Sequence, residues 1–116
     1  MSVESLDTIF AALADSTRRE ILSRLSRGSA SVGEVAAPFD MSAPAISQHL
    51  KVLERAGLIT RTVRGQWRTL ELQPEPLEEA TAWVEEQRRR WNLRLDALEE
   101  HLETMKAEQE RNESKE

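Results

Sequence analysis

The sequence predicts a mainly helical α+β fold whose β-structure is limited to one small hairpin. Three observations support this prediction. Apolar residues recur with the helical period over most of the chain. Positions 58–72 are rich in β-branched and aromatic residues around one glycine turn. After Pro74 and Pro76, which resist helix continuation, a helical pattern runs unbroken from Pro76 to about Ala107.

The first part of the chain predicts two helices with a short break between them. From Ser5 to about Ala14, apolar residues at i, i+3, i+4 and i+7 form one helical face. These residues are Leu6, Ile9, Phe10 and Leu13. A second helix continues to Gly28. We expect it to begin at Thr17, because Thr17 and Glu20 have the spacing of a capping box.

Two further helices have the spacing of a helix–turn–helix. A Ser-x-x-Glu start at Ser31 opens a short helix that Pro38 ends. Ser42 then caps a longer helix, expected over about residues 42–56, which Gly57 ends. A short helix, a short turn and a longer helix are the arrangement in which many DNA-binding proteins present a recognition helix.

The segment that follows predicts a β-hairpin beside this recognition helix. Leu58–Val63 and Trp67–Leu72 favour strands, and the residues between them, with Gly65 at the centre, favour a turn. We expect this hairpin, over about residues 58–72, to form a wing. The predicted architecture is therefore a winged helix–turn–helix followed by one long helix over about residues 76–107.

The outward positions of the predicted recognition helix are small, hydrogen-bonding or basic. Small residues let a helix approach the floor of the major groove, where hydroxyl and amide groups reach base edges and lysine reaches phosphate. The predicted DNA-binding residues are Ser42, Ala43, Ser47, Gln48, His49, Lys51, Arg61, Arg64 and Arg68. For His49, a partly buried structural role is an equally good interpretation.

The charge of the chain is divided unevenly along the sequence. The net charge of −5 argues at first against a nucleic-acid partner. However, residues 73–116 carry seven basic and thirteen acidic side chains, whereas residues 1–72 carry nine and eight. Residues 42–68 contain five basic side chains and one acid, Glu54. The predicted reading surface is therefore basic, which favours binding to DNA over a role as a protein-interaction module without DNA.

Composition excludes several other classes of protein. The chain has no cysteine, so it has no disulfide and no thiolate nucleophile. It has only four glycines and no glycine-rich phosphate loop. No acid completes a triad with the serines near His49. We therefore expect no catalytic residues and no enzyme. Its longest strictly apolar run, residues 9–14, is far shorter than the roughly 20 residues of a membrane span. With no signal-peptide pattern at the N-terminus, we expect a cytoplasmic protein.

Two stretches of the chain resemble the ArsR-type (arsenical-resistance repressor-like) winged-helix transcriptional regulators. They are FAALADSTRREIL at residues 10–22 and MSAPAISQHLKVLERAGLI at residues 41–59. The resemblance covers about residues 5–105 and implies a homodimeric repressor that binds a palindromic operator in double-stranded DNA. By motif position, it places Arg64 and Arg68 on the wing. On the recognition helix it places Ser42, Ala43, Ser47, Gln48, His49 and Lys51.

The metal sites of many such regulators are missing from this sequence. Where one group carries a Cys-x-Cys pair, this chain has residues 34–37, Glu-Val-Ala-Ala. A second group uses Asp/His and His/Glu pairs on the last helix, but here that helix offers one histidine, His101, without a second imidazole at i+4. We therefore expect no metal and no cofactor. A different small-molecule effector stays open.

The long last helix is predicted to be a dimerisation helix. Apolar residues recur on it at alternating spacings of four and three, which is close to a coiled-coil stripe. The predicted dimer-interface residues are Leu6, Phe10, Val84, Trp91, Leu95, Leu98 and Leu102. Trp83 and Trp91 could line a small ligand pocket, although packing is the favoured interpretation. We expect residues 1–107 to form one domain, and residues 108–116, which have no apolar side chain, to be a disordered tail.

Overall fold

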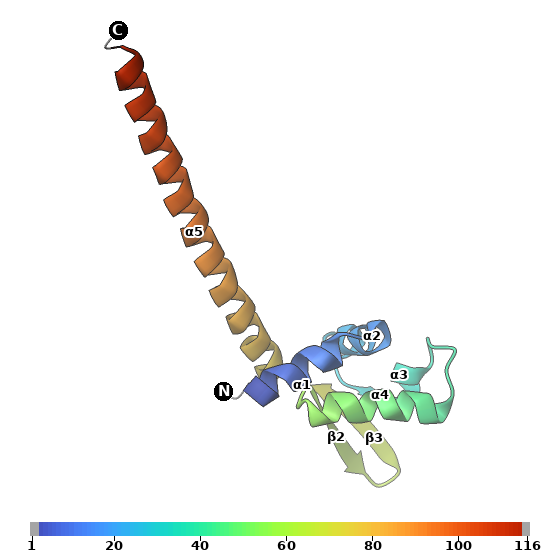
Figure 1. Ribbon diagram of the computed structural model, residues 1–116. Helices are drawn as coiled ribbons and strands as arrows, with labels where there is room; N and C mark the ends of the chain where they lie inside the picture. Colours follow the sequence, from blue (N-terminus) through green and yellow to red (C-terminus); the bar gives the residue numbers. More distant parts are fainter. Residues whose placement is uncertain (1–2, 115–116) are drawn as a thin grey trace. The chain divides into compact units, whose positions relative to one another are not determined.

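Residues 3–114, which the computed structural model describes, form five helices and three short strands. In chain order these are α1 (Val3–Leu13), α2 (Ser16–Leu25), β1 (Ala30–Ser31), α3 (Val32–Ala36), α4 (Ala43–Arg55), β2 (Ile59–Arg64), β3 (Trp67–Leu72) and α5 (Glu75–Glu113). Figure 1 shows α4 beside the β2–β3 hairpin, with the turn between β2 and β3 at the hairpin tip. The predicted fold class, a winged helix–turn–helix followed by a long helix, is confirmed.

The chain divides into two units, one that ends at Thr81 and one that begins at Ala82. The first contains the winged helix–turn–helix and the first part of α5, and the second contains the rest of α5. A single domain over residues 1–107 was expected. The buried apolar cluster lies wholly within the first unit, which explains the division.

The long helix α5 also ends later than the sequence predicted. It continues to Glu113, so residues 108–113 of the tail expected to be disordered are helical. This segment has no apolar residue, but Glu, Gln, Lys and Arg are good helix formers, and they extend a helix that is already started. Residues 1–2 and 115–116 lie outside the described residues.

The caps of the helices show how local sequence sets their starts. Ser31 and Glu34 form the expected capping box, and Ser42 accepts a hydrogen bond from the Ala45 N–H at 3.3 Å. The expected cap at Thr17 is wrong. Asp15 caps α2 instead, and its carboxylate accepts from the Arg18 N–H at 3.0 Å. Asp is a stronger cap than Thr. With Asp15 as the N-cap, Ser16 and Thr17 belong to the first turn of α2.

The sheet is a three-stranded antiparallel sheet in the order β1-β3-β2. The hairpin pairs Ile59 with Leu72 and Arg64 with Trp67 at its two ends. The two-residue strand β1, which the sequence did not predict, pairs Ala30 with Leu70. This pairing joins the start of α3 to the wing, so the helix–turn–helix and the wing share one backbone hydrogen-bond network.

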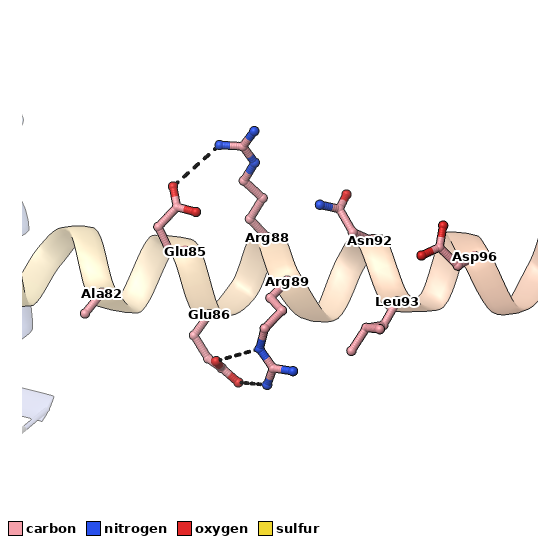
Figure 2. Close-up of a pocket in the computed structure, with 8 residues that line it drawn as sticks. All are labelled: Ala82, Glu85, Glu86, Arg88, Arg89, Asn92, Leu93 and Asp96. Atoms are coloured by element: carbon pink, nitrogen blue, oxygen red, sulfur yellow. Dashed lines mark hydrogen bonds and ion pairs between the residues drawn. The ribbon is translucent and has the colours of Figure 1, made fainter.

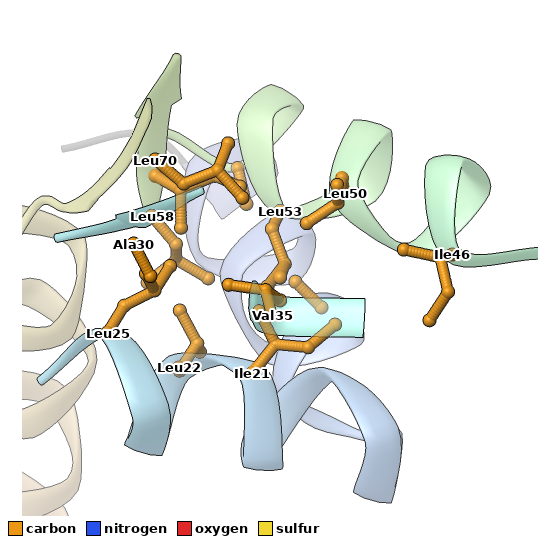
Figure 3. Packing of buried hydrophobic residues seen from close by; sticks show 13 residues of the cluster. Ile21, Leu22, Leu25, Ala30, Val35, Ile46, Leu50, Leu53, Leu58 and Leu70 are labelled. Carbon is orange, nitrogen blue, oxygen red and sulfur yellow. The ribbon is translucent and has the colours of Figure 1, made fainter. Parts of the chain in front are cut away.

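The core lies between α2, α4 and the sheet (Figure 3). Ile21, Leu22 and Leu25 extend from α2 toward Leu50 and Leu53 of α4. The core also contains Ala12, Ala30, Val35, Ile46, Ala56, Leu58, Ile59 and Leu70. The inward positions predicted for α4 are confirmed, because Ile46, Leu50 and Leu53 are all buried. The opposite face of α4 is thereby left to solvent.

Candidate nucleic-acid interface

Helix α4 presents an exposed face made of the predicted small, polar and basic residues. Ser42, Ala43, Gln48 and Lys51 are exposed, and Ser47 is half-buried. Pro44 lies in the first turn of the helix, where its missing N–H costs no hydrogen bond. The face can therefore approach a polyanion closely at its N-terminal end, where the helix dipole also favours negative charge.

The three arginines predicted on the wing differ in their surroundings. Arg64 and Arg68 are exposed and form no ion pair with another described residue. In contrast, Arg61 donates from Nη2 to Glu54 Oε1 at 2.7 Å, and 24% of its side chain is exposed. Arg61 thus connects β2 to α4, while Arg64 and Arg68 are available to bind a ligand.

A groove of about 370 Å³ separates α3 and α4 from the wing. It is lined by Val32, Gly33, Ala36, Ala43, Ile46, Ser47, Leu50, Arg61 and Arg68. The Arg61 Nε atom is buried and has no partner among the described residues. Two arginines and Ser47 therefore line a groove whose surface is mainly apolar.

His49 lies on the side of α4 that faces α2. Its Nδ1 atom is 3.3 Å from Arg18 Nη1 and 3.8 Å from Asp15 Oδ2. Only 19% of its side chain is exposed. Of the two interpretations of His49 left open by the sequence, this geometry fits the partly buried structural one.

Arg18 is a residue of this region that the sequence reasoning missed. Its Nε and Nη2 atoms donate to the Ala12 and Ala11 carbonyls, both at 2.8 Å, at the C-terminal end of α1. Its third contact is His49, 31 residues away. Only the position of Arg18 at the start of α2, close behind the end of α1, could have indicated the carbonyl contacts. No local pattern indicates the contact with His49.

The Asp15 carboxylate completes this cluster. The pKa of Asp15 lies below its ordinary value of 3.8. The hydrogen bond from the Arg18 N–H lowers it most, and the charges of His49 and Arg18 lower it further. A hydrogen bond donated to a carboxylate stabilises its charged form, which explains the direction. Asp15 therefore stays ionised at neutral pH and caps α2 as an anion.

The second unit carries five of the seven predicted dimer residues on a helix surface. Of these residues, Val84, Trp91, Leu95, Leu98 and Leu102 are 44–58% exposed. Leu6 and Phe10, on α1, are half-buried. Trp83 is 47% exposed. A ligand pocket stays the less favoured alternative for Trp83 and Trp91.

The arginine cluster on this helix pairs with acids of the same helix (Figure 2). Arg88 Nη1 lies 3.5 Å from Glu85 Oε1, and Arg89 Nη2 lies 2.7 Å from Glu86 Oε1. Arg90 reaches Glu86 at 3.1 Å. Hydrogen bonds from Arg89, and then its charge, lower the pKa of Glu86. All eight residues drawn in Figure 2 belong to one helix, so they border an open surface rather than an enclosed site.

Two other kinds of feature are absent from residues 3–114. No group of three or more His, Asp or Glu residues in this range could hold a metal ion. Within the same range, no helix is long and apolar enough to cross a membrane.

Comparisons with known proteins agree with this geometry. Residues 13–62 match the model of a helix-turn-helix domain family. The HTH-type transcriptional regulator Rv2034 of Mycobacterium tuberculosis is 47% identical over 73 residues, which are 63% of this chain and 68% of that protein. The transcriptional repressor SdpR of Bacillus subtilis is 34% identical over 79 residues, covering 68% of this chain and 88% of the repressor.

A solved structure extends the similarity to the fold. The crystal structure of an ArsR family transcriptional regulator superposes with a TM-score of 0.76 at 44% identity, covering 79% of this chain and 95% of the other. These relatives are named as regulators and not as enzymes. By sequence and by fold, this chain belongs to the ArsR family of winged helix–turn–helix transcriptional regulators.

Proposed function

We propose that this regulator is a homodimeric repressor that binds a palindromic operator in double-stranded DNA. In each subunit, α4 enters the major groove and the wing contacts the backbone. Ser42, Ala43, Ser47 and Gln48 face the bases, while Lys51, Arg64 and Arg68 bind phosphates. The relative SdpR is named a repressor, which supports repression rather than activation.

The observation that carries this proposal is the uncompensated positive charge of one face. Glu54 is the only acid among residues 42–68, and its carboxylate is occupied by Arg61. Lys51, Arg64 and Arg68 are exposed and form no ion pair with a described residue. A protein-interaction module would gain nothing from this arrangement, whereas a phosphate backbone neutralises it and releases counterions.

The structure supports different roles for two of the predicted contact residues. Arg61 is held by Glu54, so we propose that it positions the wing against α4 and adds to the local positive potential. His49 is held between Arg18 and Asp15, so we propose that it fixes the orientation of α4. Direct contacts with DNA then fall to the exposed residues.

The second unit supports the proposed dimer. A helix that exposes a row of leucines and a tryptophan to water gains free energy by pairing, at roughly 25 cal/mol per Å² of apolar surface buried. Leu6 and Phe10 on α1 are proposed to add to the same interface. Two-fold symmetry then sets two recognition helices about one DNA turn apart, roughly 34–36 Å.

Titration of labelled duplexes tests the proposal. We expect the protein to bind a fragment from its own promoter region more tightly than a scrambled fragment of equal length and composition. We also expect it to enrich an inverted repeat from a random duplex library. Equal affinity for both fragments, together with no enriched sequence, would contradict sequence-specific binding.

The same titration tests for effectors. We expect chelator to leave the affinity unchanged, because the described residues form no metal-ligand group. A loss of binding on chelation would instead reveal a metal-dependent regulator. A small organic effector is a further possibility in this family, and candidate compounds can be added to the preformed complex.

A further inference from the structure

The groove between α3, α4 and the wing has the size and the lining of a site for a small organic ligand. Its volume is about 370 Å³, and ligand pockets of proteins typically measure roughly 300–1,000 Å³. The apolar part of the lining includes Val32 and Ala36 on α3 and Ile46 and Leu50 on α4. Such pockets combine an apolar lining with a few polar groups that orient the ligand. In this groove the charged groups lie on the wing.

The two arginines of the groove lie on one face of the β2–β3 hairpin. Arg61 is opposite Leu70 in the register, and Arg68 lies two residues before Leu70 on β3. Residues two apart on a strand share a face, so Arg61 and Arg68 are neighbours on the face that carries the buried Leu70. None of the described residues that line the groove is acidic. The groove is therefore positively charged on its wing side.

The charge of these two arginines is only partly compensated. Arg61 Nη2 donates to Glu54 Oε1 at 2.7 Å, whereas Arg61 Nε is buried and finds no acceptor among the described residues. Arg68 is exposed and forms no ion pair with a described residue. A guanidinium group can bind a carboxylate through two parallel hydrogen bonds. Arg68 is therefore the residue of the groove that is free to hold an acid.

We propose that this groove binds a small carboxylic acid with an apolar body. The carboxylate pairs with Arg68, and the body lies on the apolar lining that α3 and α4 provide. The positive charge favours an acid over a neutral compound of the same shape. The apolar lining favours an organic acid over inorganic phosphate or sulfate, because an inorganic ion would leave that surface in contact with water.

The acid and the operator compete for the same residues. Arg68 and Ser47 line the groove, and both are among the proposed DNA contacts. An acid bound there occupies the guanidinium group that would otherwise bind a phosphate, so it acts as an inducer that releases the protein from DNA. This regulatory consequence rests on the proposed function. Binding of the acid to the free protein does not.

Calorimetric titration of the free protein tests the binding of the acid. The ligands are 2-naphthoate and octanoate, each compared with its neutral amide. We expect at least one acid to bind at one site per subunit. Its amide should bind at least tenfold more weakly, which is about the effect of one hydrogen bond to a charged group. Absence of binding by both acids, or equal binding of acid and amide, would overturn the proposal.

Two pairs of matched variants locate the bound acid. Arg68→Gln removes a charge that lines the groove, and Arg64→Gln removes an exposed charge of the same hairpin outside it. Ala36→Leu fills part of the groove, and Ala37→Leu adds the same side chain at the next, exposed position. We expect the first variant of each pair to bind the acid at least tenfold more weakly and the second to retain the wild-type affinity.

Thermal unfolding records whether each variant is folded. If Ala36→Leu does not fold, the arginine pair decides the location by itself. Equal affinity of Arg68→Gln and Arg64→Gln for the acid would overturn the assignment to this groove.

Anisotropy of a labelled operator duplex tests the competition. The acid is added at constant ionic strength, and the control replaces it with chloride, because salt alone weakens binding to DNA. At an acid concentration ten times its Kd, the apparent Kd for the operator should rise about elevenfold. An acid that binds the free protein without changing this Kd would overturn the competition. Failure of the protein to bind any duplex would contradict the proposed function, whereas calorimetry would still decide whether the groove binds the acid.

Discussion

Arg61 and Arg64 lie on the same strand, yet their surroundings give them different tasks. Arg61 points to Glu54 on α4 and is mostly covered, while Arg64 is exposed near the tip of the wing. A residue that is already neutralised within its own subunit has less to gain from a phosphate than one that is not. Lys51 on α4 shares the exposed situation of Arg64.

Replacing either exposed cation is predicted to weaken operator binding in a salt-dependent way. Lys51→Ala and Arg64→Ala should each lower the affinity and reduce the slope of log K against log salt by about 0.9, the value for one lost phosphate contact. Fluorescence anisotropy across a salt series measures both quantities. Arg27→Ala removes an exposed cation outside the helix–turn–helix and serves as the control. Unchanged affinity and slope in both variants would exclude them as phosphate contacts.

Gln48 is predicted to affect sequence preference more than overall affinity. Its amide lies on the exposed face of α4, and a glutamine amide can pair in two places with adenine. Gln48→Ala should relax the preference at one base pair of each half-site by about 1–3 kcal/mol while leaving the salt slope unchanged. Selection from a randomised operator library measures this. A uniform loss across all positions would instead indicate a backbone contact.

At the scale of the element, the start of α2 depends on one side chain and its charge. Asp15 begins α2, and its pKa lies below the ordinary value. A carboxyl whose folded pKa is depressed adds stability above its unfolded pKa of about 3.9 and loses it as pH falls through the folded pKa. The contribution of Asp15 is therefore complete at neutral pH and disappears in acid.

A closely matched variant can test this pH dependence of the stability that Asp15 contributes. Asp15→Asn keeps an oxygen that can cap the helix but removes the charge. We expect wild type to be more stable than Asp15→Asn at pH 7, and the difference to shrink below about pH 4. Asp15→Ala should cost about 1 kcal/mol more because it removes the cap itself. Urea unfolding at several pH values measures these differences. If the difference in unfolding free energy between wild type and Asp15→Asn did not change with pH, the charge effect would be ruled out.

Helix α5 allows an equally matched test of the proposed dimer. Leu98 and Leu93 are 54% and 55% exposed on the same helix, but Leu98 lies on the apolar coiled-coil stripe and Leu93 on the opposite side of the helix. Leu98→Glu should yield monomers in sedimentation and lose operator affinity with them. Leu93→Glu adds the same charge at nearly the same exposure and should remain dimeric. If the two variants behaved alike, the coiled-coil stripe would not be the dimer interface.

At the scale of the whole molecule, the sequence predicted what depends on local pattern. Helical periodicity, the caps at Ser31 and Ser42 and the turn at Gly65 were enough for the winged helix–turn–helix. Strand β1 was missed because two residues show no periodicity, and they form a strand only by pairing with β3. The Thr17 cap was wrong because Asp15, two residues earlier, offers a better acceptor to the same turn.

The parts of the candidate site that the sequence could not predict are contacts between distant residues. Glu54 and Arg61 belong to different elements, and only the packing of the wing on α4 brings them together. Arg18 and His49 are separated further along the chain and meet through the packing of α2 on α4. Periodicity indicates which face of a helix is buried, but it does not say which polar side chain will meet another at the edge of that face.

The contacts of Arg18 connect two surfaces that are usually considered separately. One guanidinium holds the last carbonyls of α1, the helix that carries Leu6 and Phe10, and also contacts His49 on α4. A tilt of α4 during operator binding must therefore carry the end of α1 with it or give up these hydrogen bonds. The free energy of dimerisation and the free energy of operator binding are then coupled through the contacts of Arg18. A change that strengthens one would therefore shift the geometry available to the other.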